Sequence, residues 1–537
     1  MASSKKSDVW KYFVKLEDQN KTKCLLCSAM LTYTGGSTSS MKNHLKGRHM
    51  KVNLKDSAPT QRQLTLAEVQ KSKTKISETR YNTITKSLAL ACALDLRPIS
   101  MVTGKGFRHF CSKLNPDYQV PCRTTVTRSL QLLYDEAKSD LITLLSGCDV
   151  SLTKDLWTSC TTVPYITFTG HFINENWSMY GKILATRPIS GRHTGSNIAS
   201  CVKEIKTEFS IRNISAIVTD NAKNMVVAAD EANVIRWPCF SHTLQLAVED
   251  GLKDKGITKA LAFARKLVGH FKHSGTASIA LKDRQVKDGV AKPLMVIQSV
   301  PTRWNSQYFM ATRLLKLRIH IFAVLMDDKI TDSKLRSSLD LPDASWKILE
   351  DIVPILAPFA DATELLTKEE APTLGQVYIL LFQLVTQTLA ANSEDSSTAR
   401  NLRSNIKQSL MTRFQLRKDG VPKNLHSLAM VASFLDPRYK SLRMLSATER
   451  ADVVTYVQGL IPDDVPPGDV PTDVKQEPEE QEAVVDISTG SIFQCLMGDV
   501  EIDLTTPGAI QEECDHYMAE PVRIADPLIW WKTNEPR

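Results

Sequence analysis

Two cysteines and two histidines near the N-terminus place the strongest constraint on how this chain can fold. Cys24 and Cys27 are separated by two residues, and His44 and His49 by four. The first spacing suits a tight turn between strands and the second suits one face of a helix, so the four side chains can surround one tetrahedral ion. The pattern therefore predicts a structural zinc site with these four ligands. Such a short segment cannot bury enough apolar area to fold alone, so the metal must supply much of its folding free energy.

Charge is distributed unevenly along the 537 residues, whose net charge is +8. Residues 1–80 contain 16 Lys and Arg against 6 Asp and Glu, whereas residues 461–520 contain 16 acidic residues against a single base, Lys475. A basic head is the electrostatic footprint of a protein that contacts phosphate backbones, so double-stranded DNA is the predicted partner. The acidic stretch is typical of a solvated tail or of a segment that binds another protein.

The composition indicates an intracellular protein. No stretch is long and apolar enough to span a bilayer, and the N-terminus lacks the apolar core of a secretory signal. The eleven cysteines are then expected to be thiols or metal ligands. The run KSKTK at 71–75 fits a nuclear import signal and fits a solvated linker equally well, and both interpretations stay open.

The middle of the chain changes from helical to strand-forming patterns at residue 149. Three stretches rich in β-branched and aromatic residues, between 149 and 188, predict an antiparallel meander. A helix at 196–209, an apolar strand at 214–220 and a further helix follow. This order of elements, with three strands followed by a helix, a strand and a helix, is that of an RNase H-like fold.

The predicted fold class is multidomain: a small zinc-stabilised ββα finger, then an RNase H-like α/β domain with a large all-α insertion. Changes in composition set the expected boundaries of its regions. They are a finger at 1–50, a basic linker at 51–78, a helical intermediate region at 79–148, an RNase H-like core at 149–245, a helical insertion at 246–460, an acidic disordered segment at 461–520 and a final segment at 521–537.

Two acidic residues occupy strand positions that favour apolar or β-branched side chains. Asp155 lies in the first strand of the meander, and Asp220 ends the fourth strand. Nucleases of the RNase H type hold two metal ions with carboxylates on neighbouring strands, so this pair is a candidate catalytic site. Each residue taken alone would more often be a turn or cap residue.

Several motifs resemble known families. An aromatic pair, Trp10 and Phe13, followed by C-x2-C and H-x4-H, resembles the BED zinc finger over residues 7–50. The remaining chain resembles the hAT transposase superfamily, especially the domesticated BED finger proteins derived from it. The motifs that carry this second resemblance are FRHFCSKLNPDYQVPCRTTV (107–126), PCFSHTLQLAV (238–248), RWNS (303–306) and ASFLDPRYK (432–440).

The resemblance to BED fingers implies that the aromatic pair braces the finger and that its helical part contacts DNA. Met41 and Leu45 would then face the core. The residues left to contact phosphates and base edges are Ser40, Lys42, Asn43, Lys46 and Arg48.

The resemblance to hAT transposases implies a catalytic triad of two Asp residues and a later Glu, a Cys-x2-His pair that supports it, and a Trp that assists a flipped base. Matched to this sequence, these roles fall on Asp155, Asp220, Cys239, His242 and Trp304. The family continues through the third acidic residue and a dimerisation surface, whereas this chain stops at Arg537. We therefore expect vestigial catalytic residues, no transposase activity, and a homodimer interface that is largely missing.

Two short motifs in the acidic segment point to the SUMO pathway. VKQEPEE at 474–480 fits an acceptor site, with Lys475 as the acceptor, and EIDLT at 501–505 resembles a SUMO-interacting strand. The sequence as a whole predicts a zinc-dependent, DNA-binding regulator of transcription in the nucleus. An active or remnant hAT transposase and a SUMO ligase acting on chromatin are the alternatives.

Overall fold

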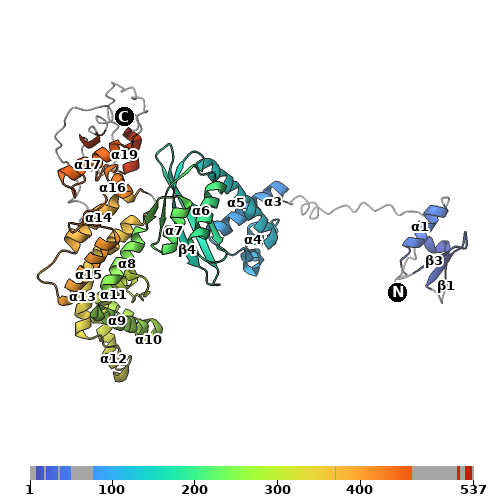
Figure 1. Ribbon diagram of the computed structural model, residues 1–537. Helices are drawn as coiled ribbons and strands as arrows, with labels where there is room; N and C mark the ends of the chain where they lie inside the picture. The colour runs from blue at the N-terminus through green and yellow to red at the C-terminus, as the bar shows by residue number, and fades with distance from the viewer. Residues whose placement is uncertain are drawn as a thin grey trace, which may run out of the picture. The chain divides into compact units, whose positions relative to one another are not determined.

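The computed structural model describes residues 8–16, 20–33, 37–49, 76–368, 371–461, 514, 517–519 and 526–534. The chain divides into two compact units, Met1–Ala137 and Lys138–Arg537. The first holds the finger and the helices that follow it. The second holds a sheet domain and a large helical region (Figure 1).

The finger is a three-stranded antiparallel sheet packed on one helix. After a 3-10 turn at Asp8–Lys11, its elements are β1 Phe13–Leu16, β2 Lys21–Cys24, β3 Met30–Thr32 and α1 Ser39–Arg48. The predicted ββα unit is present as β2, β3 and α1. The structure adds β1 at the edge, where Phe13 is opposite Cys24. Met41 and Leu45 of α1 are fully buried, as predicted, and pack with Phe13 and Val9.

Three α-helices follow the finger in sequence. They are α3 Glu78–Leu94, α4 Lys105–Leu114 and α5 Arg123–Leu145. Ser77 caps α3, because its side chain accepts a hydrogen bond from the backbone N–H of Arg80. The buried core of these helices is small and centres on Ala89, Val102 and Val126.

The second unit contains a five-stranded mixed sheet with the order β6-β5-β4-β7-β8. Its strands are β4 Asp149–Thr158, β5 Pro164–Ile173, β6 Met179–Pro188, β7 Asn213–Thr219 and β8 Arg236–Pro238. The first three form the predicted antiparallel meander. Helix α6, Gly195–Glu208, then leads to β7, which pairs with β4 in parallel. This is the predicted RNase H-like topology. The sequence did not reveal β8, since three residues are too few to show a period-two pattern.

One face of the sheet is covered by α6 and by α7, which spans Lys223–Ala232 (Figure 1). Leu152 and Phe168 of the strands are fully buried in one cluster with Ile198 and Met225 of the helices. Successive strand residues point to opposite faces, so Asp155 lies on the other, more exposed face of β4. The buried face therefore anchors the strand, and the other face presents its polar side chains.

Most of the remaining chain is helical. The helices are α8 Phe240–Leu252, α9 Lys255–His273, α10 Gly275–Lys287, α11 Trp304–Leu325, α12 Ser333–Leu339, α13 Asp343–Leu366, α14 Val377–Gln383, α15 Ser397–Arg413, α16 Leu428–Phe434, α17 Ala447–Gln458 and α19 Pro527–Asn534. Their apolar faces share one core. Gly251 permits close packing of α8 on α15, because a Cβ there would lie 2.4 Å from Cγ1 of Ile406. None of the helices within the described ranges combines the length and the apolar character that a bilayer crossing demands.

Some of the sequence predictions concern residues outside the described ranges. These are the linker at 51–75 with its KSKTK run, the acidic stretch at 462–513 with Lys475, and the EIDLT motif. The predicted final segment at 521–537 does contain described residues, and they form α19.

Candidate metal centre and nucleic-acid interface

The four predicted zinc ligands come together in the finger. Cys24 ends β2 and Cys27 lies in the turn after it, while His44 belongs to α1 and His49 to its C-cap position. The turn is closed by a 2.9 Å hydrogen bond from the N–H of Ser28 to the carbonyl of Cys24. Ser28 has a φ of 58°, the left-handed conformation that such a tight turn requires.

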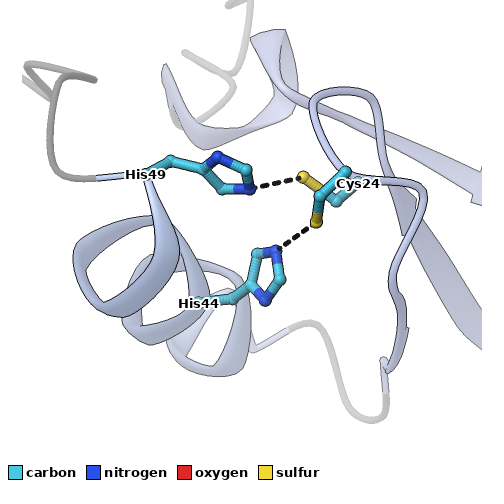
Figure 2. A group of neighbouring side chains, drawn as sticks. Cys24, His44 and His49 are labelled. Atoms are coloured by element: carbon cyan, nitrogen blue, oxygen red, sulfur yellow. Dashed lines mark hydrogen bonds between the residues drawn. The ribbon is translucent and has the colours of Figure 1, made fainter.

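The ligand atoms are spaced as a tetrahedral zinc ion requires. All four lie within 4.8 Å of one another. The Cys24 Sγ is 3.7 Å from the His49 Nε2, and the Cys27 Sγ is 3.2 Å from the His44 Nε2. Bond lengths of about 2.3 Å to sulfur and 2.0 Å to nitrogen separate two tetrahedral ligands by roughly 3.5 Å. Figure 2 shows both imidazoles projecting from one helix toward cysteine sulfur. The residues are positioned to bind zinc.

The surroundings of His44 favour the neutral imidazole that zinc binds. Burial lowers the pKa of His44, and the neighbouring His49 and Arg48 lower it further. The ring of Phe13 meets the His44 ring edge-on at 5.8 Å between centroids. The aromatic brace that the BED resemblance implied thus touches a zinc ligand directly.

Helix α1 carries three of the predicted DNA contacts on its exposed side. Lys42, Asn43 and Lys46 are all exposed, whereas Met41 and Leu45 hold the opposite side against the sheet. A helix that is anchored along one side and polar along the other can enter a DNA groove without disturbing its own packing.

The other two predicted contacts, Ser40 and Arg48, are also exposed. The hydroxyl of Ser40 is 3.4 Å from the carbonyl of Thr32 and donates to it. Arg48 lies about 140° around the helix from Asn43, from the 100° step between helical residues. Arg48 is therefore on another side of the helix from Asn43.

The finger carries further positive charge that the sequence reasoning missed. Lys21 and Lys23 are exposed on β2, which alternates exposed lysines with buried residues. That period-two alternation in KTKC was the signal that could have placed them. Residues 19–55 contain no acidic residue. Asp8, the described carboxylate of the finger, pairs with Lys11 at 3.1 Å. This excess of positive charge attracts polyanions.

The two candidate catalytic carboxylates lie at the same level of the sheet. Thr153 of β4 is paired with Val218 of β7, and Asp155 and Asp220 each follow two residues later. Asp155 is exposed and Asp220 half-buried, and an Asp220 oxygen accepts a 2.9 Å hydrogen bond from a backbone N–H. Within the described residues, the finger holds the only group of three or more His, Cys, Asp or Glu side chains with ligand atoms this close together.

Two cations accompany this acidic pair, and the sequence reasoning identified neither. Lys154 is buried on the helix-covered face of β4. Burial lowers its pKa to about 8, against the opposing influence of Asp220 and Asp155. Arg236 of β8 donates to the Asp220 carbonyl at 2.7 Å and to the Asn221 side chain at 2.9 Å. Lysine at a buried strand position was a visible anomaly, whereas nothing in the sequence marked Arg236.

The predicted supporting pair lies beside Asp220. The backbone N–H of Cys239 donates to the carbonyl of Thr219 at 2.8 Å, and Cys239 is the residue that precedes α8. His242 is exposed in the first turn of that helix. The structure therefore brings Cys239, and the helix turn that carries His242, to the end of β7 that Asp220 follows.

Trp304 is placed differently from what the hAT resemblance implied. Its side chain is 1% exposed, in the core of the helical region. Its ring meets Phe359 edge-on at 6.4 Å between centroids. In this structure its ring packs in the core, away from the surface.

Three family models match successive parts of the chain. Residues 7–50 match the BED zinc finger, residues 153–233 match the ZBED1 RNase-like domain, and residues 237–354 match the ZBED1 RNase-like helical domain. These matches coincide with the finger, the sheet and the first helices of the helical region. The fold and the metal centre thus define the class of proteins that join a BED zinc finger to an RNase-like domain, and this chain is similar to transposases and to BED finger proteins.

Individual relatives agree with this class. The chain is 26% identical to the putative AC transposase of Zea mays, over 69% of this chain and 49% of the relative. It is 24% identical to zinc finger BED domain-containing protein 4 of Homo sapiens, over 86% and 40%. It is 22% identical to the putative transcriptional regulator tpeD of Talaromyces stipitatus, over 78% and 50%. The chain thus spans half or less of the length of each of these three relatives.

Proposed function

We propose that this chain is a nuclear regulator of transcription that docks on duplex DNA through α1, and that its RNase H-like body is a scaffold without transposase activity. The observation that carries the proposal is the zinc centre directly beneath an exposed basic helix. Cys24 and His44 fix that helix from one side, and Lys42, Asn43 and Lys46 occupy the other. One relative is named a putative transcriptional regulator, which supports the regulatory part of the proposal.

Genome-wide mapping of binding sites tests this function. The intact protein should occupy promoters, and a His44→Ala variant, which lacks a zinc ligand, should lose those sites. Occupancy confined to transposon ends would instead favour the transposase alternative. The proposed SUMO acceptor Lys475, the SUMO ligase alternative and a homodimer remain predictions from the sequence.

Binding to DNA should weaken steeply as salt increases, because bound lysines release counterions from the phosphates. If three of the exposed lysine or arginine side chains contact phosphate, affinity should fall roughly 40-fold between 50 and 200 mM salt. Lys46→Ala should weaken binding to all sequences alike and reduce the logarithmic salt slope by about 0.9. Fluorescence anisotropy with labelled duplexes measures both quantities.

Asn43→Ala should behave differently from the lysine variant. Asn43 can pair with the edge of an adenine, so its loss should relax sequence preference by about 1–3 kcal/mol at one base position and leave the salt slope unchanged. Lys11→Ala is the matched control for Lys46→Ala, because it also removes one positive charge from the finger, at a residue paired with Asp8. Binding that does not respond to salt would contradict the DNA-binding proposal.

We also expect that the chain neither nicks nor joins transposon-end DNA in Mg²⁺ or Mn²⁺. Two-metal cleavage needs a concentration of negative charge. Two cations have charges that oppose metal binding at Asp155 and Asp220: Arg236, and Lys154 on the opposite face of β4 from Asp155. An oligonucleotide cleavage assay with the full chain decides the point. If the protein cuts and Asp155→Asn abolishes cutting, the chain is an enzyme and the scaffold proposal is wrong.

A further inference from the structure

The ASFLDPRYK motif at 432–440 forms a socket for residues near the end of the chain. Its Asp436 and Lys440 are buried, and Asp436 pairs with Arg438 at 2.7 Å. The hydroxyl of Tyr517 donates to the carbonyl of Phe434 at 2.8 Å. The Lys440 ammonium donates to the Tyr517 carbonyl and lies 4.7 Å from the centre of its ring. A residue nearly 80 positions further along the chain thus satisfies a buried lysine.

Helix α19 extends this contact with two tryptophans. Trp530 is 8% exposed and meets the Tyr517 ring at 5.2 Å between centroids. Trp531 stacks on Tyr517 at 5.5 Å, and its indole N–H donates to the carbonyl of Leu435 at 2.9 Å. Aromatic area and directed hydrogen bonds therefore hold the segment in one orientation.

The same helix reaches the sheet through Trp177. This residue lies in the turn between β5 and β6, where its φ is 57°. Bulky residues rarely adopt the left-handed conformation, because Cβ then approaches the following carbonyl. Its ring nevertheless stacks on Trp531, with centroids 6.0 Å apart and planes 13° apart. The strained turn therefore holds the ring of Trp177 against Trp531.

We propose that Tyr517 and α19 act together as a strap that closes the helical region and holds it on the β5–β6 turn. The connecting residues 462–513 lie in sequence between α17 and Tyr517, and Tyr517 and α19 are then part of the same folded unit as the helical region. The strap should therefore stay bound after the connection is cut, because the contacts of Tyr517, Trp530 and Trp531 do not depend on it.

Cleavage of the full-length protein tests the strap. A recognition site for a sequence-specific protease is inserted between residues 480 and 490, and the cut protein is analysed by size-exclusion chromatography in native buffer. The C-terminal fragment should elute with the rest of the chain and separate only in denaturant. Separation of the two fragments in native buffer would overturn the proposal.

Two variants test whether the strap reaches the sheet. Trp177→Asn keeps a residue type that tolerates positive φ and removes the stacking partner, so folding of the turn should survive. Hydrogen exchange of residues 527–534 should then accelerate roughly two- to twelvefold, the range expected for one lost aromatic pair. Ile529→Ala is the control. Ile529 is 61% exposed on α19, so its substitution should leave the exchange unchanged. Equal exchange in the two variants would show that Trp177 does not hold the strap.

Discussion

Replacing Cys24 with serine should unfold the finger and abolish DNA binding by the whole protein. The described core of the finger consists of five buried residues, and Cys24 is one of them. So few apolar contacts cannot offset the entropy of ordering about 40 residues, so the metal supplies the difference. Metal analysis should find one zinc per chain in the native protein and none bound to the finger of the variant. Circular dichroism of segment 1–50 should show loss of structure.

His44→Ala should have the same effect, because it removes a ligand from the helix that presents the DNA contacts. Cys122→Ser is the matched control, since Cys122 is an exposed cysteine outside the finger. That variant should keep both its zinc and its affinity for DNA. A segment 1–50 that stays folded after chelation of the metal would disprove the structural role of zinc.

Replacing Trp304 with alanine should destabilise the second unit severely. Its side chain is fully buried against Phe359 and the rest of the helical core, and large-to-small substitutions of this kind cost about 3–5 kcal/mol. The free energy of unfolding, measured by denaturant titration of the full chain, should fall by that amount. The finger should keep its zinc, because it belongs to the other unit.

An exposed aromatic residue on the same helix provides the comparison. Phe309 of α11 is 49% exposed, so Phe309→Ala should change the free energy of unfolding far less. A Trp304→Ala protein that is as stable as the native chain but has altered DNA binding would contradict the core position. It would restore the role in base stacking that the hAT resemblance implied.

Local patterns were sufficient for the finger and for the order of the elements. Ligand spacing is a local property, since a turn sets the distance between Cys24 and Cys27 and a helix sets that between His44 and His49. The burial of Met41 and Leu45 follows from the same helical repeat. The antiparallel meander was predictable because its strands are consecutive in sequence and rich in β-branched residues.

Contacts between distant segments could not be predicted in this way. Arg236 meets Asp220 only because β8 lies beside β7 in the folded sheet. Trp304 resembled a functional tryptophan in sequence, and its burial depends on helices that come up to 55 positions later. Hydrophobic periodicity marks a side of a helix as apolar but does not say what will cover it.

The sequence by itself thus determined the zinc ligands and the succession of strands and helices, because each depends on spacing along the chain or on motifs within it. Only the tertiary structure decided that Lys154 and Arg236 accompany the acidic pair, that Trp304 is a core residue, and that the ASFLDPRYK motif receives α19. Those outcomes depend on which distant surfaces meet, and that is settled by burial and hydrogen bonding summed over the whole fold.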